Sequence, residues 1–212
     1  MEYMNYFQTV ARSAKFENII KKSRFIALVQ GIETEPEVRS FLKEAAQKYP
    51  DAAHHCWAYR LDSGKNKISQ YSDGGEPANS AGPPILQAIK QEQLTNVIVL
   101  VIRYFGGIKL GKSGLIKAYR ETARSGLQQA GKKRSYPWQE FIIEGIEYQS
   151  LGTILQSIES KSGKIDDILY GDRVKISALL PEIELEWLRQ LINNVTQGKA
   201  GLKIGAIRWI DG

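Results

Sequence analysis

Hydrophobic and polar positions divide the chain into short segments of strand and helix. Residues 14–20 and 23–31 are rich in β-branched and aromatic side chains, and they predict two strands joined by a tight turn. Apolar side chains recur at helical spacing over residues 36–48, after a potential cap at Thr34. The apolar run within 95–105 does not alternate, so it predicts a strand buried on both faces.

The remaining elements follow from the same patterns. Between these segments we expect strands at 54–61 and 67–71 around a turn at 62–65, a loop at 72–82, a helix from 83 and a helix at 112–130. Further along, we expect strands at 141–148, 164–170, 174–179 and 202–209, with helices at 151–160 and 181–195. The second half therefore has the order βαββαβ of a ferredoxin-like fold.

A change in composition separates these two regions. The stretch 131–137 combines a glycine, a run of basic residues and a proline, and it predicts a linker. We therefore expect an α+β protein of two domains, at 1–131 and 138–212, which fits a length of 212 residues.

Charge is distributed unevenly along the chain. The net charge is +6, but residues 1–135 hold 21 Lys+Arg against 12 Asp+Glu, whereas residues 136–212 hold 8 against 11. The stretch 103–134 holds 9 basic residues and the single acid Glu121. This asymmetry favours a polyanionic partner for the first half over a merely solvated helix face.

The composition also predicts where the protein works. The only cysteine is Cys56, which fits a reducing compartment, and the first residues lack the pattern of a secretory signal. The longest apolar run, 97–102, is far shorter than the roughly 20 residues of a membrane helix. We expect a soluble cytoplasmic protein without a membrane partner.

Residues 106–113, with the sequence GGIKLGKS, match the P-loop pattern between a predicted strand and a predicted helix. No further parallel βα units follow, so we do not expect an NTPase. Backbone N–H groups freed by glycines and a following helix N-terminus still favour anions. In the predicted helix, Ser113, Lys117, Arg120 and Arg124 share one face, and apolar residues form another. The predicted anion or nucleic-acid site comprises Arg103, Gly106, Gly107, Lys109, Gly111, Lys112, Ser113, Lys117, Arg120 and Arg124.

Two other clusters suggest chemistry less specifically. His54 and Cys56 point to one face of a strand, but zinc needs three or four ligands and the chain has only one other histidine, so we predict no metal site and no cofactor. Neighbouring strand residues point to opposite faces, which disfavours a Cys–His hydrolase. Asp73 and Glu76 are more typical of turn chemistry than of acid–base catalysis.

Three blocks taken in order carry a resemblance to a known family. They are HHCWAYR at 54–60, SDGGEPANSAG at 72–82 and VIRYFGGIKLG at 101–111. Together they resemble the YigZ/IMPACT family over essentially the whole chain. The resemblance implies an N-terminal domain similar to the second domain of ribosomal protein S5, and a ferredoxin-like C-terminal domain similar to the last domain of elongation factor G.

The family resemblance bears on function as well. The resemblance implies that eukaryotic members act in translational control by binding a regulator of a stress-responsive kinase, through an additional N-terminal domain together with the shared one. We expect this sequence to start at the shared domain, so their partner is not carried over. The motif implies a surface site formed by His54, His55, Asp73, Gly74, Gly75, Glu76, Pro77, Ser80 and Gly82, without assigned catalytic residues.

Three hypotheses follow from the sequence. The first is a non-enzymatic protein linked to translation that binds RNA or the ribosome, with a translation-regulatory protein as a further partner. The second is an enzyme for a phosphorylated or nucleotide substrate, with His54, Asp73 and Glu76 beside the glycine-rich loop; it predicts a concave site and perturbed titrations. The third is a protein-interaction module.

Overall fold

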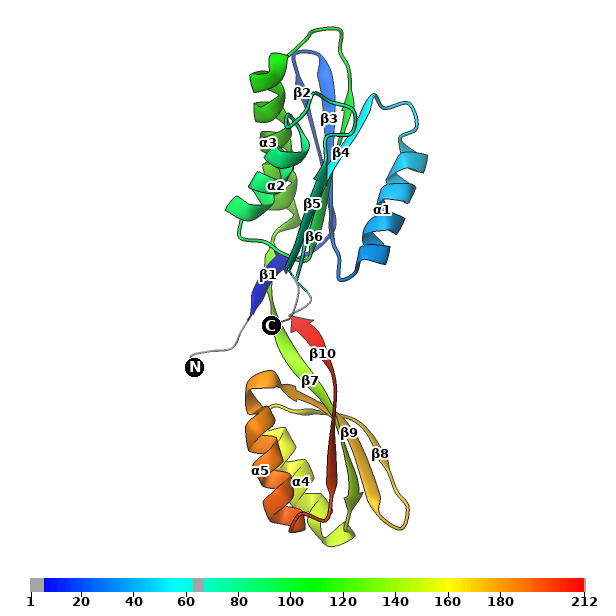
Figure 1. Cartoon of the computed structure of the whole chain (residues 1–212), viewed down its shortest axis with the longest axis vertical. Coiled ribbons are helices and arrows are strands. Elements are labelled where there is room, and N and C mark those ends of the chain that lie inside the picture. Colours follow the sequence, from blue (N-terminus) through cyan, green and yellow to red (C-terminus); the bar gives the residue numbers. More distant parts are fainter. Residues whose placement is uncertain (1–5, 63–66, 212) are drawn as a thin grey trace. The chain divides into compact units, whose positions relative to one another are not determined.

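The computed structural model describes residues 6–62 and 67–211, and it divides into two units. Phe7–Arg134 form the N-terminal unit, and the C-terminal unit comprises the residues from Ser135 onwards together with Tyr6. Both units combine helices with an antiparallel sheet (Figure 1), so the expected α+β class is confirmed.

The N-terminal unit is built on a five-stranded antiparallel sheet in the order β2-β3-β6-β4-β5. Its strands are β2 (Ala14–Ile20), β3 (Ser23–Gly31), β4 (His54–Asp62), β5 (Lys67–Ser72) and β6 (Val97–Tyr104). A further short strand, β1 (Phe7–Val10), precedes them and was not predicted from the sequence. Gln8 of this strand accepts a hydrogen bond from the N–H of Thr95 at 2.9 Å.

Helices cover both faces of this sheet (Figure 1): α2 (Gly82–Gln91) and α3 (Gly111–Ala130) lie on one face, and α1 (Glu35–Lys48) lies on the other. The central strand β6 explains the apolar run in the sequence. Val97, Val99 and Val101 belong to the core formed with α2 and α3. Ile98, Leu100 and Ile102 belong to the cores under α1, so the prediction of a strand buried on both faces is confirmed.

Local sequence signals explain where these helices begin and which face they bury. Thr34 caps α1 by accepting from the N–H of Glu37, and the Glu37 carboxylate accepts in return from the N–H of Glu33 at 3.0 Å. Along α3, Tyr119, Ala123 and Leu127 are fully buried, whereas the predicted basic positions lie on the outer side.

The C-terminal unit has the predicted βαββαβ order. It runs through β7 (Lys132–Ile146), α4 (Tyr148–Ser160), β8 (Lys164–Leu169), β9 (Val174–Pro181), the short 3-10 turn η1 (Glu182–Glu184), α5 (Leu185–Thr196) and β10 (Gly201–Asp211). The strands pair antiparallel, with β10 and β9 on β7 and β8 on β9. Ile154 and Ile158 of α4 and Leu188 and Ile192 of α5 pack on one face of this sheet.

The predicted linker at 131–137 contains the division between the units, but most of it is regular strand, because β7 starts at Lys132 and its residues from Ser135 pair with β10. The turn expected at 62–65 falls largely outside the described residues. In the described part of the chain, no helix is long and apolar enough to cross a membrane.

Candidate anion-binding site of the N-terminal unit

Asp73 organises the loop between β5 and α2. Its carboxylate accepts hydrogen bonds from the backbone N–H groups of Asn79 at 2.8 Å, Ala81 at 2.9 Å and Gly82 at 2.9 Å. Partial burial acts to raise the pKa of Asp73, but these N–H groups outweigh it, so its pKa is lowered. Asp73 therefore holds the loop closed as an anion, and its oxygens are occupied by the chain itself.

The two glycines after Asp73 are required by geometry. Both have a positive φ, 54° at Gly74 and 85° at Gly75. A side chain at Gly74 would also place its Cβ 2.2 Å from the carbonyl oxygen of His55. The loop can therefore cross β4 closely only with glycine at this position.

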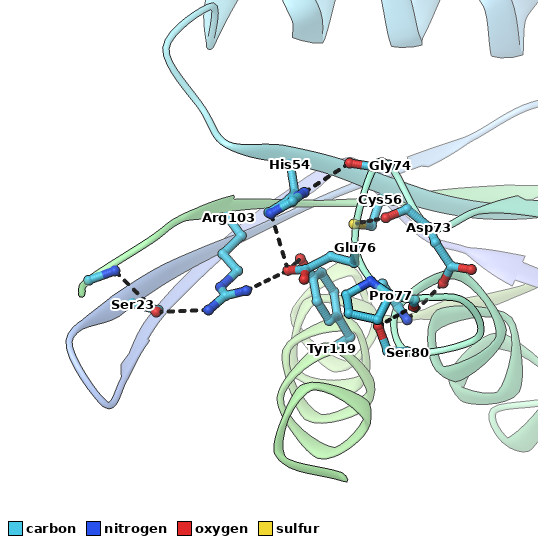
Figure 2. Close-up of polar contacts among 12 residues, drawn as sticks. Ser23, His54, Cys56, Asp73, Gly74, Glu76, Pro77, Ser80, Arg103 and Tyr119 are labelled. Carbon is cyan, nitrogen blue, oxygen red and sulfur yellow. Dashed lines mark hydrogen bonds and ion pairs between the residues drawn. The ribbon is translucent and has the colours of Figure 1, made fainter. Parts of the chain in front are cut away.

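This crossing carries Glu76 into the interior of the unit. The Glu76 side chain is 3% exposed, and its Oε1 accepts from Arg103 Nη1 at 2.6 Å and from the Tyr119 hydroxyl at 2.7 Å (Figure 2). Arg103 comes from the end of β6 and Tyr119 from the middle of α3. Burial raises the pKa of the Tyr119 hydroxyl, which therefore remains a donor to the carboxylate.

Arg103 connects this carboxylate to the neighbouring hairpin. Its Nη2 donates to Ser23 Oγ at 3.3 Å, and the same hydroxyl accepts from the N–H of Gly106 at 3.2 Å. The guanidinium carbon lies 5.5 Å from the ring centre of Phe25 and 5.4 Å from that of Phe105. The Nε of Arg103 is buried and has no hydrogen-bond partner among the described residues.

His54 approaches the same oxygen of Glu76 as Arg103 does (Figure 2). Its Nδ1 is 3.0 Å from the carbonyl oxygen of Gly74, which can only accept, so Nδ1 carries the proton. Its Nε2 is 3.8 Å from Glu76 Oε1, which is within ion-pair range but too long for a hydrogen bond. The Nε2 of the neighbouring His55 is buried, and within residues 6–62 and 67–211 it has no hydrogen-bond partner.

Cys56 is not available for chemistry. The thiol is fully buried and donates to the carbonyl oxygen of Asp73 at 2.9 Å. Burial raises the pKa of this thiol to about 12, so the reactive thiolate is absent near neutral pH. A Cys–His nucleophile therefore finds no support. Within 6–62 and 67–211, no cluster of three or more His, Cys, Asp or Glu residues could hold a metal.

An open cavity of about 310 Å³ lies against this polar cluster. Its lining comes from β4, from the Asp73 loop, from the end of β6 and from the start of α3. The lining residues are His54, Glu76, Pro77, Arg103, Phe105, Lys109, Leu110, Gly111, Lys112 and Leu115. Predicted residues from two separate motifs, the Asp73 loop and the glycine-rich loop, therefore meet at one concave site. Of the two carboxylates named with His54, however, only Glu76 lines it.

The wall formed by α3 is positively polarised. Leu110 precedes the helix and provides no side-chain cap, and its first turn contains no acidic residue. Among the described residues, no ion pair involves Lys109 or Lys112, and both are exposed. The free N–H groups of the first turn and these two ammonium groups together favour an anion.

Three other predicted basic residues, Lys117, Arg124 and Arg103, are already paired, whereas Arg120 is half-buried and forms no ion pair within the described residues. Lys117 lies 3.9 Å from Glu121, and Arg124 lies 3.5 Å from Glu92, an acid outside the basic stretch that also binds Lys132 at 2.7 Å. Arg103 is 4% exposed and its charge is directed to Glu76. The sequence analysis predicted that Arg103 contacts a phosphate backbone at the surface. In the structure Arg103 instead lines the cavity from inside the unit.

The motif positions are likewise divided between surface and interior. Glu76, Ser80 and Gly82 are buried, whereas Gly75 and Pro77 are exposed. The Ser80 hydroxyl donates to the carbonyl oxygen of Pro77 at 2.5 Å, within the loop. Only part of the predicted motif surface is therefore accessible, because the loop uses the other positions to fold on itself.

The structure adds two lysines that the sequence analysis did not single out. Lys21 and Lys22 form the turn between β2 and β3, both are exposed, and both have a positive φ. A Cβ at Gly106 would lie 2.0 Å from the backbone carbonyl oxygen of Lys22, so this turn touches the glycine-rich loop directly. The dibasic pair is visible in the sequence, but its position beside residue 106 follows only from the pairing of β3 with β6.

The glycine-rich loop itself is not a P-loop. It follows β6, which pairs antiparallel with β3 and with β4, whereas a P-loop domain is built on a parallel sheet. The match to that pattern is therefore a coincidence of glycines and a lysine, as the sequence analysis expected. What the loop shares with a P-loop is the helix N-terminus behind it.

Comparison with known proteins agrees with this architecture. Residues 21–127 match the Impact N-terminal domain, and residues 145–199 match a Domain of unknown function (DUF1949). The chain is 30% identical to the IMPACT family member YvyE of Bacillus subtilis, over 98% of this chain and 94% of that protein. The chain belongs to the IMPACT family.

Two further relatives support the assignment along its length. This IMPACT family protein is 30% identical to the family member YigZ of Escherichia coli, over 86% of this chain and 90% of YigZ. A solved structure described as a hypothetical protein matches it with a TM-score of 0.69 and 29% identity, covering 97% of this chain and 99% of that one. The predicted resemblance is confirmed.

Proposed function

We propose that this IMPACT family protein binds RNA through its N-terminal unit, in a role linked to the regulation of translation. The observation that carries the proposal is the N-terminus of α3, which has no side-chain cap, with the exposed lysines Lys109 and Lys112, which form no ion pair within the described part of the chain. Together with Lys21 and Lys22 they form what we call the basic rim. Four ammonium groups and a helix N-terminus provide the contacts to phosphate oxygens that position a protein on a nucleic acid.

Net charge supports a polyanion as the ligand. The stretch 103–134 carries 9 basic residues against one acid, and the acids that approach it in the fold, Glu76 and Glu92, neutralise Arg103, Arg124 and Lys132 but not the rim. An unneutralised cluster of lysines raises the local concentration of polyanions and accelerates their association. The link to translation rests on the family resemblance, and RNA is the polyanion that this link favours.

The proposal predicts how steeply the Kd for RNA depends on salt concentration. If each of the four rim lysines neutralises one phosphate of a single strand, log Kd rises with log salt with a slope of about 3, because each contact contributes about 0.7. Replacing Lys109 and Lys112 with glutamate removes two of these contacts and adds repulsion. We expect the slope to fall to about half or less, together with a large loss of affinity at low salt.

The experiment measures the anisotropy of a fluorescent RNA across a salt series. It compares the wild type with Lys109→Glu/Lys112→Glu and with a matched control, Lys43→Glu/Lys48→Glu. Both control residues are exposed lysines of α1, on the opposite face of the sheet. The control changes the net charge by the same amount, so it distinguishes RNA binding at the basic rim from a general attraction of RNA by the positive net charge. Equal losses in the two variants, or no binding by the wild type at physiological salt, would refute the proposal.

The cavity favours a second candidate function. The sequence hypothesis of an enzyme for a phosphorylated or nucleotide substrate requires a concave site, and His54 and Glu76 both line the 310 Å³ cavity. Turnover of a phosphorylated metabolite that is abolished by His54→Ala, with weak or salt-independent RNA binding, would favour the enzyme. Co-sedimentation of the wild type with ribosomes, lost in the rim variant, would favour the translation-linked role.

A further inference from the structure

The cavity beside the basic rim differs from the rim in its chemistry. Its lining combines the cationic start of α3, apolar side chains that include Phe105 and Leu115, and the buried ion pair of Glu76 with Arg103. We infer that this cavity binds one unpaired nucleotide, with the phosphate at the start of α3 and the base against Phe105. The inference rests on the proposed RNA binding and names the form of RNA, a single strand, that the site prefers.

The phosphate position is defined by three neighbouring groups. Lys109, Gly111 and Lys112 all line the cavity at the start of α3. The helix presents free N–H groups there, since neither Leu110 nor an acidic first-turn residue occupies them. A phosphate group accepts from such N–H donors and from ammonium groups, whereas an uncharged ligand would leave the lysines uncompensated.

Phe105 provides the surface for the base. Its side chain is 52% exposed, and one side of the ring is supported by the Arg103 guanidinium, whose carbon lies 5.4 Å from the ring centre. Arg103 is itself held by Glu76 and by Phe25, so the ring rests on a fixed support. A planar base that stacks on the exposed part of Phe105 would remove this apolar surface from water.

The Glu76 carboxylate has an unused acceptor at the cavity lining. Every described side-chain hydrogen bond and ion pair of Glu76 is made by Oε1, and no described residue donates to Oε2. An acceptor on a residue that lines the cavity complements the amino group on the edge of adenine, cytosine or guanine. A sugar phosphate would satisfy the cationic wall but would leave Phe105 uncovered.

Size and shape restrict the ligand further. A volume of 310 Å³ lies at the lower end of the range of about 300–1,000 Å³ for small-molecule sites, which suits one nucleotide. A base within a duplex is stacked on both faces and paired along its edge, so it cannot enter without being flipped out. Single-stranded RNA and free mononucleotides present the required unit without that cost.

The experiment compares ligands and variants in one matrix. The ligands are an unstructured RNA strand, the same strand in a duplex, and nucleoside 5′-monophosphates. The variants are the wild type, Phe105→Ala, the rim variant Lys109→Glu/Lys112→Glu, and Tyr71→Ala. Tyr71 is a matched control because it is an aromatic residue of the same unit, 47% exposed, outside the cavity lining.

We expect the wild type to prefer the single strand over the duplex. Phe105→Ala should weaken single-strand binding about 5- to 150-fold, the range for one base–aromatic stack, and leave duplex binding unchanged. The rim variant should weaken the binding of both the single strand and the duplex, whereas Tyr71→Ala should leave the binding of both unchanged. This pattern tests base stacking separately from phosphate binding.

The remaining outcomes separate this inference from the proposed function. If the single strand and the duplex bind equally and Phe105→Ala has no effect, the nucleotide cavity is refuted while RNA binding through the rim stands. If mononucleotides bind in a Phe105-dependent way and neither RNA does, the cavity is supported and the RNA-binding function is refuted. If no ligand binds, both are refuted.

Discussion

Replacing Glu76 with glutamine tests whether the buried ion pair holds the site together. The substitution keeps the size of the side chain and removes its charge. Arg103 would then retain a guanidinium that is 5% exposed, with Ser23 Oγ as its only other hydrogen-bond acceptor among the described residues. Tyr119 would at the same time donate to an amide in place of a carboxylate.

The expected magnitude follows from this burial. Removing one partner of a buried ion pair costs about 3–5 kcal/mol of unfolding free energy, because the other charge remains uncompensated. The control is Glu92→Gln. Glu92 binds Arg124 and Lys132, whose side chains are 61% and 42% exposed, so water can replace the lost carboxylate. For these more exposed ion pairs we expect Glu92→Gln to lower the unfolding free energy by about 1 kcal/mol or less.

Hydrogen exchange of the β6 amides is the suitable assay, because β6 is the central strand of the N-terminal unit and reports on that unit alone. A loss of about 3–5 kcal/mol accelerates the slowest amides about 100- to 4,000-fold, since each 1.4 kcal/mol is a factor of about ten. Glu76→Gln/Arg103→Met should recover most of the loss, because an apolar side chain of similar length needs no counter-charge. If Glu76→Gln and Glu92→Gln accelerate exchange equally, the pair does not stabilise the site.

Two further predictions concern residues beside Glu76. Because the pKa of Asp73 is lowered in the folded state, its carboxylate stabilises the protein at pH values above the usual carboxyl range, and this contribution is lost as pH falls through the folded-state pKa. The difference in Tm between wild type and Asp73→Asn should therefore be constant above about pH 5 and shrink toward pH 3. A difference that grows on acidification would contradict this prediction. The Cys56 thiol has no exposed surface, and burial raises its pKa to about 12. It should therefore resist a thiol reagent at pH 8 until the protein is unfolded. Rapid labelling of the folded protein would show that the buried position is wrong.

Sequence patterns were sufficient for the elements that have a strong local or periodic signal. The run 97–102 predicted a doubly buried strand because apolar side chains on both parities need cover on both faces. The apolar and basic positions of the helix after 111 predicted which side of α3 faces the core. The short strand β1 carries no such periodicity, and the start of β7 is rich in charge, so neither was predicted.

For the candidate site, the sequence named most of the residues but not their roles. It placed His54, Glu76 and Lys109 in three motifs far apart in the chain, and spacing alone does not show that strand pairing and the Asp73 loop bring them to one cavity. The burial of Arg103 and its pairing with Glu76 also depend on tertiary packing, because a charged residue at a strand end looks the same whether it faces water or a carboxylate. Likewise, the dibasic turn at Lys21 reaches the glycine-rich loop only through the register of β3 and β6. Composition and periodicity therefore determined which segments fold and carry charge, whereas the long-range pairing of strands decided which of those charges remain free to bind a ligand.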